Sequence, residues 1–168
     1  MTKRSMIWTA ALVSSGVIIL GARDNPLRIT QAAAQTAPAA LSEAQDVNGV
    51  AGVVAEIVQC KRDGGVLSIR MRLRNTGDAK AEVKVLASGD WYDRYYVTAG
   101  SKKYFVLRDS EKTPLANPPT SYGALGVEIA KGGTFVWYAK YPAPPAEVKK
   151  INYYTPITTP FEDIPITD

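Results

Sequence analysis

Apolar and polar residues alternate along much of the chain beyond Val53, which predicts β-strands that each bury one face. The clearest run is Leu67–Arg74, where apolar side chains occupy every second position and a serine and three arginines occupy the others. Ala81–Val85 alternates in the same way, after turn residues at 75–78. We expect these two strands to form an antiparallel pair or to face each other across two sheets.

Two strand–loop–strand patterns follow. Residues 95–98 and 103–108 flank a short loop that contains Gly100, and residues 127–129 precede a Gly-Gly turn and the strand Thr134–Lys140. Short loops with glycine between two such runs are typical of β-hairpins.

The strand Thr134–Lys140 places Phe135, Trp137 and Ala139 on one face, which is predicted to give the core its largest side chains. Prolines after Lys140 end this strand, because proline cannot donate to a ladder. Residues 148–154 are expected to form the last regular strand.

These elements amount to about seven short strands with no convincing amphipathic helix. The predicted fold class is therefore all-β, an immunoglobulin-like antiparallel β-sandwich over residues 53–168, preceded by an N-terminal signal or anchor helix. A small β-barrel is the alternative.

The N-terminus has the pattern of an export signal. Lys3 and Arg4 precede the uncharged, largely apolar stretch Ile7–Ala22, which is short for a bilayer span of about 17 to 25 residues. Residues 1–34 are therefore expected to be a signal peptide cut after the Ala32–Ala34 cluster, in a protein exported to the periplasm or the extracellular space. A cut after Ala22 and an uncleaved membrane anchor remain the alternatives.

Residues 35–52 are rich in Ala, Pro, Ser, Gln and Asn and are expected to form a flexible linker. A short helix capped by Ser42, with Leu41, Ala44 and Val47 on one face, is the alternative. Its apolar face is thin.

The charge balance argues against a nucleic-acid partner. Removing residues 1–34 takes away Lys3, Arg4, Arg23, Arg28 and Asp24 and lowers the formal net charge from +4 to +1. Nucleic-acid binding needs a concentrated basic footprint. Cys60 is the only cysteine, so no internal disulfide exists, and the thiol is expected to be a small buried side chain.

The part of the chain beyond Val53 resembles a family of small exported bacterial immunoglobulin-like domains, the type exemplified by a mycobacterial secreted antigen. The resemblance rests on the Leu-x-Ile-x-Met-x-Leu-x-Asn-Thr-Gly run at 67–77, the glycine turn before Phe135-Val136-Trp137, the Tyr-Pro-Ala-Pro-Pro segment at 141–145 and residues 160–166. It implies the fold and export, and it implies no catalytic residues. The paired cysteines of antibody domains are absent.

The chain contains no histidine, which excludes Ser-His and Cys-His nucleophilic systems and the usual imidazole-based zinc and copper sites. We expect no metal, no cofactor and no enzyme activity. The alternative is a glycoside hydrolase of envelope polysaccharide that uses paired carboxylates. Its candidates are Asp90 with Asp93 and Glu162 with Asp163, which the simpler interpretation assigns to turns and to a solvated tail.

Two groups of residues are candidate binding sites. Arg70, Arg72 and Arg74 share one strand face and could bind an acidic glycan or a lipid headgroup, although pairing with neighbouring carboxylates such as Glu82 is more frequent. The second group is an aromatic cluster next to Asp90, Asp93 and Arg94. It consists of Trp91, Tyr92, Tyr95, Tyr96 and Tyr104.

Aromatic residues beside hydrogen-bonding groups are typical of sugar- and protein-binding surfaces, although half of them could simply fill the core. The predicted function is a non-enzymatic binding or structural module of the bacterial cell envelope. Its partner is an unknown envelope protein or glycan, and the membrane is contacted only through the N-terminal segment if it is uncleaved. An accessory subunit that binds another chain along an edge strand is a further alternative.

Overall fold

The computed structural model describes residues 38–120 and 122–168. The predictions of a signal peptide or anchor over residues 1–34 and of its cleavage fall outside the described residues. In the described part, no helix has the length and apolar character needed to cross a bilayer.

The described residues form antiparallel strands and a single 3-10 helix, η1 (Gly89–Arg94). The strands are β1 (Gln45–Asp46), β2 (Val53–Asp63), β3 (Val66–Asn75), β4 (Ala81–Leu86), β5 (Tyr96–Ala99), β6 (Lys102–Phe105), β7 (Leu125–Ile129), β8 (Thr134–Pro142), β9 (Lys150–Tyr154) and β10 (Phe161–Pro165). The all-β expectation is confirmed, with β1, β2 and β10 in addition to the predicted strands.

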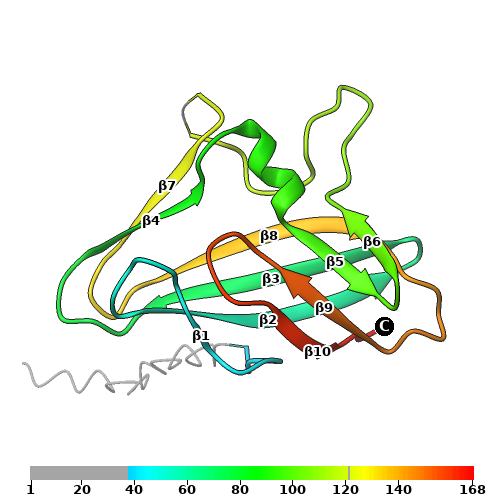
Figure 1. Ribbon diagram of the computed structural model, residues 1–168, viewed down its shortest axis with the longest axis horizontal. Helices are drawn as coiled ribbons and strands as arrows, with labels where there is room; N and C mark the ends of the chain where they lie inside the picture. Colours follow the sequence, from blue (N-terminus) through cyan, green and yellow to red (C-terminus); the bar gives the residue numbers. More distant parts are fainter. Residues whose placement is uncertain (1–37, 121) are drawn as a thin grey trace, which may run out of the picture. The chain divides into compact units, whose positions relative to one another are not determined.

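The strands make two four-stranded sheets and one two-stranded ribbon (Figure 1). Sheet I has the order β1-β2-β3-β8, sheet II has the order β10-β9-β5-β6, and β4 pairs with β7. Of the two arrangements expected for Ala81–Val85 and Leu67–Arg74, direct antiparallel pairing is wrong, because β3 is already bonded on both edges, to β2 and to β8, and β4 pairs with β7. The predicted hairpin around Gly100 is confirmed as β5 and β6.

The core lies where the inner faces of sheets I and II meet. Trp137 and Ala139 of β8 are buried and Phe135 is partly buried, so the predicted core face of this strand is confirmed. Sheet II supplies Tyr153 and Phe161, both almost completely buried. These large side chains come from the facing sheets, and their packing is expected to provide most of the hydrophobic stabilisation.

The polar groups of three buried aromatic side chains form hydrogen bonds with one another. The Trp137 indole Nε1–H donates to the Tyr153 hydroxyl at 3.0 Å, and the Tyr141 hydroxyl donates to the same oxygen at 3.3 Å. Burial raises the pKa of Tyr141 and Tyr153 well above the usual range of a phenol, so these groups stay protonated. Buried polar groups are costly unless they are paired, and this network pairs them.

The expected linker is ordered at its C-terminal end. The backbone amide of Leu41 donates to the Ile57 carbonyl at 2.6 Å, and β1 pairs with β2. Val47 is only 4% exposed. The segment joins the sheet because it buries this valine and covers the outer edge of β2, which would otherwise leave backbone groups unpaired.

A buried asparagine organises the turn after β3. Asn75 is 1% exposed, and its amide nitrogen donates to the carbonyls of Ala79 and Ile129 at 2.8 and 2.9 Å. Its side-chain oxygen accepts from the Gly77 amide at 3.0 Å. Gly52 packs against this turn with a positive φ of 76°, and a Cβ there would lie 2.8 Å from the Gly77 Cα, so only glycine fits.

Cys60 is fully buried on β2 and is a free thiol, as expected. Desolvation raises its pKa to about 12. The thiol is therefore a small core side chain and not a reactive group.

Candidate functional site

The predicted aromatic cluster divides into core and surface residues. Tyr92 and Tyr95 are 3% and 0% exposed. Their hydroxyls donate to the carbonyls of Asn117 at 2.7 Å and Val85 at 2.5 Å, and both rings lie near Trp137. The assignment of these two tyrosines to a binding site is therefore wrong, because their rings and hydroxyls are already used by the core.

Trp91 and Arg94 lie on the other side of η1. The Arg94 guanidinium carbon is 5.0 Å from the centroid of the partly buried Trp91 ring, a cation–π contact. Trp91 also lines a hollow of about 500 Å³. Its other walls are Val47–Val50, Glu82, Val83, Lys84, Pro156 and Ile157.

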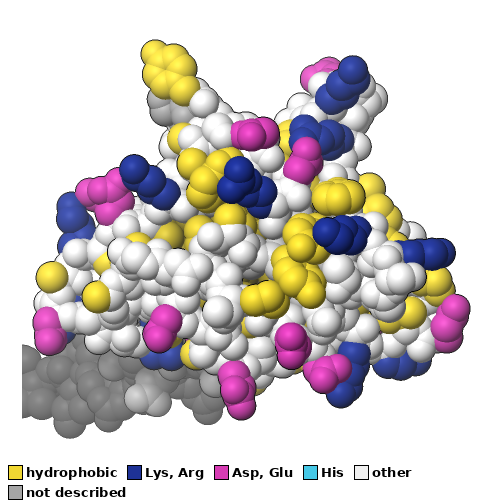
Figure 2. Space-filling model, viewed as in Figure 1, with side chains coloured by type: hydrophobic (Ala, Val, Ile, Leu, Met, Phe, Trp, Pro, Cys, Tyr) yellow, Lys and Arg dark blue, Asp and Glu magenta, His cyan; other side chains and the backbone are white. Residues whose placement is uncertain are grey.

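Tyr96 belongs to a different surface, the outer face of sheet II. The ladder places it opposite Phe105 of β6 on one side and opposite Tyr154 of β9 on the other. We call Phe105, Tyr96 and Tyr154 the aromatic row. Phe105 is 47% exposed, while Tyr96 and Tyr154 are half-buried. Figure 2 shows apolar side chains beside a basic one over β5, β6 and β9.

Within the aromatic row, Tyr96 and Tyr154 stack face to face, whereas the Phe105 ring is tilted by 48° against Tyr96 at a centroid distance of 6.0 Å. Tyr96 and Tyr154 are parallel within 8° at a centroid distance of 4.6 Å, close to the spacing of adjacent strands. The Lys103 ammonium lies 4.5 Å from the Tyr96 centroid and comes from the opposite neighbouring strand. Both faces of the Tyr96 ring are therefore occupied, and the row offers ring edges, hydroxyls and the open Phe105 side chain.

Tyr104, the remaining member of the predicted cluster, is partly buried and packs against the core. Phe105 and Tyr154 were missed at the level of sequence. Phe105 lies on β6, the hairpin partner of β5, and Tyr154 lies on β9, which is far from Tyr96 in the chain. The register of both strands against β5 brings the three together.

The arginines of β3 face outward, as predicted, but differ in their partners. Glu56 of β2 accepts from the Arg72 Nε at 2.9 Å and lies 3.6 Å from the Arg74 Nε. Glu82, the partner expected from sequence, is on β4 in the two-stranded ribbon, away from these arginines. Arg70 is exposed, and within the described residues no carboxylate lies within ion-pair distance of it.

The candidate catalytic carboxylates lie on the surface, and three of them contact other polar side chains. Asp93 binds Arg108 at 3.2 Å and Asp163 lies 3.8 Å from Lys150. A hydrogen bond from the Ser88 hydroxyl lowers the pKa of Asp90, whereas a general acid at neutral pH needs a raised pKa. Asp90, Asp93, Glu162 and Asp163 are all exposed.

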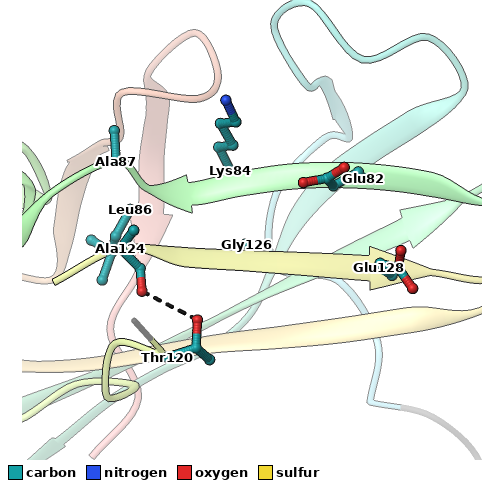
Figure 3. A pocket seen from close by; sticks show the side chains of 8 residues that line it. All are labelled: Glu82, Lys84, Leu86, Ala87, Thr120, Ala124, Gly126 and Glu128. Carbon is teal, nitrogen blue, oxygen red and sulfur yellow. Dashed lines mark hydrogen bonds between the residues drawn. The ribbon is translucent and has the colours of Figure 1, made fainter. Parts of the chain in front are cut away.

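Another pair of carboxylates lies on the β4–β7 ribbon. Glu82 and Glu128 are directly opposite each other beside a hollow of about 460 Å³ (Figure 3). Both are exposed, and the Lys80 ammonium binds Glu128 at 2.7 Å. A general acid in a hydrolase is usually desolvated by its surroundings, so this ribbon has the character of a solvated face.

Over residues 38–120 and 122–168, no group of three or more Cys, Asp or Glu side chains is placed to hold a metal ion. No protein-family model, no curated protein and no solved structure matches the chain.

Proposed function

We propose that this protein is a non-enzymatic binding module of the bacterial cell envelope that engages a partner protein through the aromatic row. The observation that carries the proposal is the row itself. Phe105 exposes 47% of its surface beside Tyr96, Tyr154 and the Lys103 ammonium. Exposed aromatic groups next to a cation are enriched where proteins bind one another.

The ring geometry favours a protein over a sugar as the partner of this surface. A sugar ring stacks on an open aromatic face, but Tyr154 and Lys103 already cover the Tyr96 ring. Ring edges and hydroxyls suit the mixed apolar and polar contacts of a protein interface. Lys102 and Lys103 on the short edge strand β6 suit a partner with acidic groups at its margin.

The same proposal includes an immunoglobulin-like arrangement of the two sheets. It is supported by two antiparallel four-stranded sheets whose inner faces share one core and by consecutive strands that change sheet, such as β7 and β8. Such modules commonly act by binding and present their sites on sheet faces and loops. The resemblance to exported bacterial domains leads to the same proposal.

We propose that the protein is exported to the periplasm or the extracellular space. The basis is the pair Lys3 and Arg4 followed by the apolar stretch Ile7–Ala22. Mass spectrometry of the protein recovered from the periplasm or medium is expected to show a chain that begins near Gln35. A full-length chain found only in the cytoplasm would contradict export, and one retained in the inner membrane would assign the anchor alternative.

The experiment for the binding surface is capture from envelope extract with the purified full chain. We expect Phe105→Ala and Tyr96→Ala to weaken retention of a captured protein about 30-fold, the size of a typical interface hot spot. The matched control is Tyr122→Ala, which removes a fully exposed aromatic side chain outside the row. Equal losses in the control and row variants, or no loss in either row variant, would refute this surface.

A second candidate function is an accessory subunit that accepts an extended chain along β4. In the described part of the molecule, β4 pairs only with β7, and the hollow lined by Trp91 lies on its unpaired side. Unpaired strand edges bind extended chains through backbone hydrogen bonds. This candidate predicts that Trp91→Ala lowers partner retention while Phe105→Ala leaves it unchanged. The reverse result would exclude it.

A further inference from the structure

The outer face of sheet I carries an excess of cations. Its basic residues are Lys61, Arg70, Arg72, Arg74 and Lys140, and its acidic residues are Asp46, Glu56 and Asp63. Glu56 neutralises the part of the face around Arg72 and Arg74. The remaining cations gather at the other end of β3.

A bulge in β2 places Gln59 and Lys61 on the outer face, opposite Arg70 and Ser68 of β3. The pairing between β2 and β3 shifts between Ile57 and Gln59, so one extra residue is inserted and the alternation of the strand changes phase. Beyond the bulge two rows cross the sheet, one above the other. They are Gln59–Arg70–Tyr138 and Lys61–Ser68–Lys140.

Both rows point away from the core. Cys60, Ile69 and Ala139, which alternate with them along the three strands, are almost fully buried, and successive side chains on a strand point to opposite faces. Tyr138 is 41% exposed. The rows therefore present a phenol ring, cations and neutral hydrogen-bonding groups on one open surface.

The surface is hollowed at this point. A depression of about 200 Å³ is lined by Gln59, Ser68, Arg70, Tyr138 and Lys140, together with the inward-facing Ile69 and Ala139. Among the described residues, no carboxylate forms an ion pair with Arg70, Lys61 or Lys140. The depression thus combines unneutralised positive charge, amide and hydroxyl groups and one aromatic side chain.

We propose that this depression binds an acidic oligosaccharide, with its carboxylate or phosphodiester group on Arg70 and Lys140 and a sugar ring against Tyr138. The guanidinium fork of arginine suits planar anionic groups, and lysine supplies a second point charge. Gln59 and Ser68 can bind sugar hydroxyls. The exposed ring, with Val136 39% exposed beside it, gives apolar contact that a free inorganic anion would not use.

This site is independent of the proposed protein-binding surface. It lies on the outer face of sheet I, whereas the aromatic row lies on sheet II. A variant at either surface therefore tests one proposal without changing the residues of the other.

The test is calorimetric titration of the full chain with oligogalacturonate, and with its methyl ester as the uncharged counterpart. We expect Arg70→Gln and Lys140→Gln each to raise the dissociation constant about tenfold, the value of a charge-assisted hydrogen bond. Tyr138→Ala is expected to weaken binding by a similar factor. Added salt is expected to weaken it further, because exposed charges are screened over about 10 Å or less.

The matched control is Arg74→Gln, which makes the same change on the same face of the same strand. Because Glu56 already pairs with Arg74, we expect a change of less than about threefold. An Arg74→Gln effect as large as that of Arg70→Gln would overturn the site, since diffuse charge would then explain binding. Equal affinity for the methyl ester, or no oligogalacturonate binding, would also overturn it.

A membrane surface is the competing partner for these cations. Vesicles that contain an anionic lipid are expected to bind wild type and Arg70→Gln equally, because the proposal assigns Arg70 to an oligosaccharide and not to a lipid headgroup. Vesicle binding that depends on Arg70, in the absence of oligogalacturonate binding, would replace the glycan by a lipid headgroup. Equal urea unfolding midpoints for all variants verify that the substitutions leave the fold intact.

Discussion

Replacing Trp137 by alanine tests the core on which both proposed surfaces rest. Its side chain is fully buried, its ring centroid lies 4.5 Å from that of Tyr95, and its indole N–H donates to the Tyr153 hydroxyl. Truncating a buried tryptophan costs about 3 to 5 kcal/mol through lost transfer energy and the cavity that remains. Loss of the hydrogen bond from the indole N–H to the Tyr153 hydroxyl, which then accepts only from Tyr141, adds about 1 kcal/mol.

A loss of about 4 to 6 kcal/mol is a large part of the total stability of a domain, which is usually about 5 to 15 kcal/mol. Equilibrium unfolding in urea, followed by circular dichroism, is the assay. With an m-value of about 2 kcal/mol/M, the midpoint is expected to fall by roughly 2 to 3 M. Trp137→Phe retains much of the ring packing and is expected to cost about 2 kcal/mol.

Tyr138→Ala is the matched control, because Tyr138 is the next residue on β8 and is 41% exposed on the opposite face. It is expected to change the free energy of unfolding by less than about 1 kcal/mol. If Trp137→Ala shifts the midpoint no more than Tyr138→Ala does, the assignment of faces on β8 is refuted.

Three further predictions concern buried polar groups. The Cys60 pKa is about 9.0 when unfolded and about 12 when folded, so only the unfolded chain releases this proton in between. The thiol's contribution to stability is complete below pH 9 and declines by up to about 1.4 kcal/mol per pH unit above it. Above pH 9, the free energy of unfolding should fall less steeply with pH in Cys60→Ala than in the wild type. An identical pH dependence in both proteins would contradict the raised pKa of the Cys60 thiol. Asn75→Ala leaves the Ile129 carbonyl and the Gly77 amide without their side-chain partners, and urea unfolding is expected to show a free energy of unfolding lowered by about 2 kcal/mol. Tyr95→Phe loses the hydrogen bond to the Val85 carbonyl and should lower stability by about 1 kcal/mol while partner retention stays constant; reduced retention at unchanged stability would return Tyr95 to the binding site.

The strands predicted from sequence have either a clear alternation, as in β3 and β8, or a glycine-containing turn beside them, as in β5 and β6. β3 lies inside sheet I and β8 lies beside it, and each strand has one buried face and one outward face. β2 was missed because its bulge changes the phase of alternation and because Glu56, a charged residue, is buried beneath the arginines. β10 begins directly after Pro160 and ends at Pro165. Such prolines are typical of a tail, yet the strand buries Phe161 and Ile164.

The candidate site residues could also be predicted only in part from the sequence. The sequence pattern left open which of the clustered aromatic residues fill the core. Tyr92 and Tyr95 are three apart at a 3-10 helix, where such side chains share one side. That spacing was the available signal for their joint burial. The aromatic row and the depression at Arg70 depend on cross-strand register, which local sequence does not specify when the partner strands are far apart in the chain.

Site-specific photo-crosslinking in living cells tests the central claim most directly. A photoreactive amino acid is placed at position 105 in the aromatic row, at position 122 on an exposed loop, or at position 84 on β4, each in the full chain. The account predicts that position 105 forms an adduct with one envelope protein and that positions 122 and 84 do not. An adduct formed at position 84 or 122, with none at position 105, would contradict binding through the outer face of sheet II.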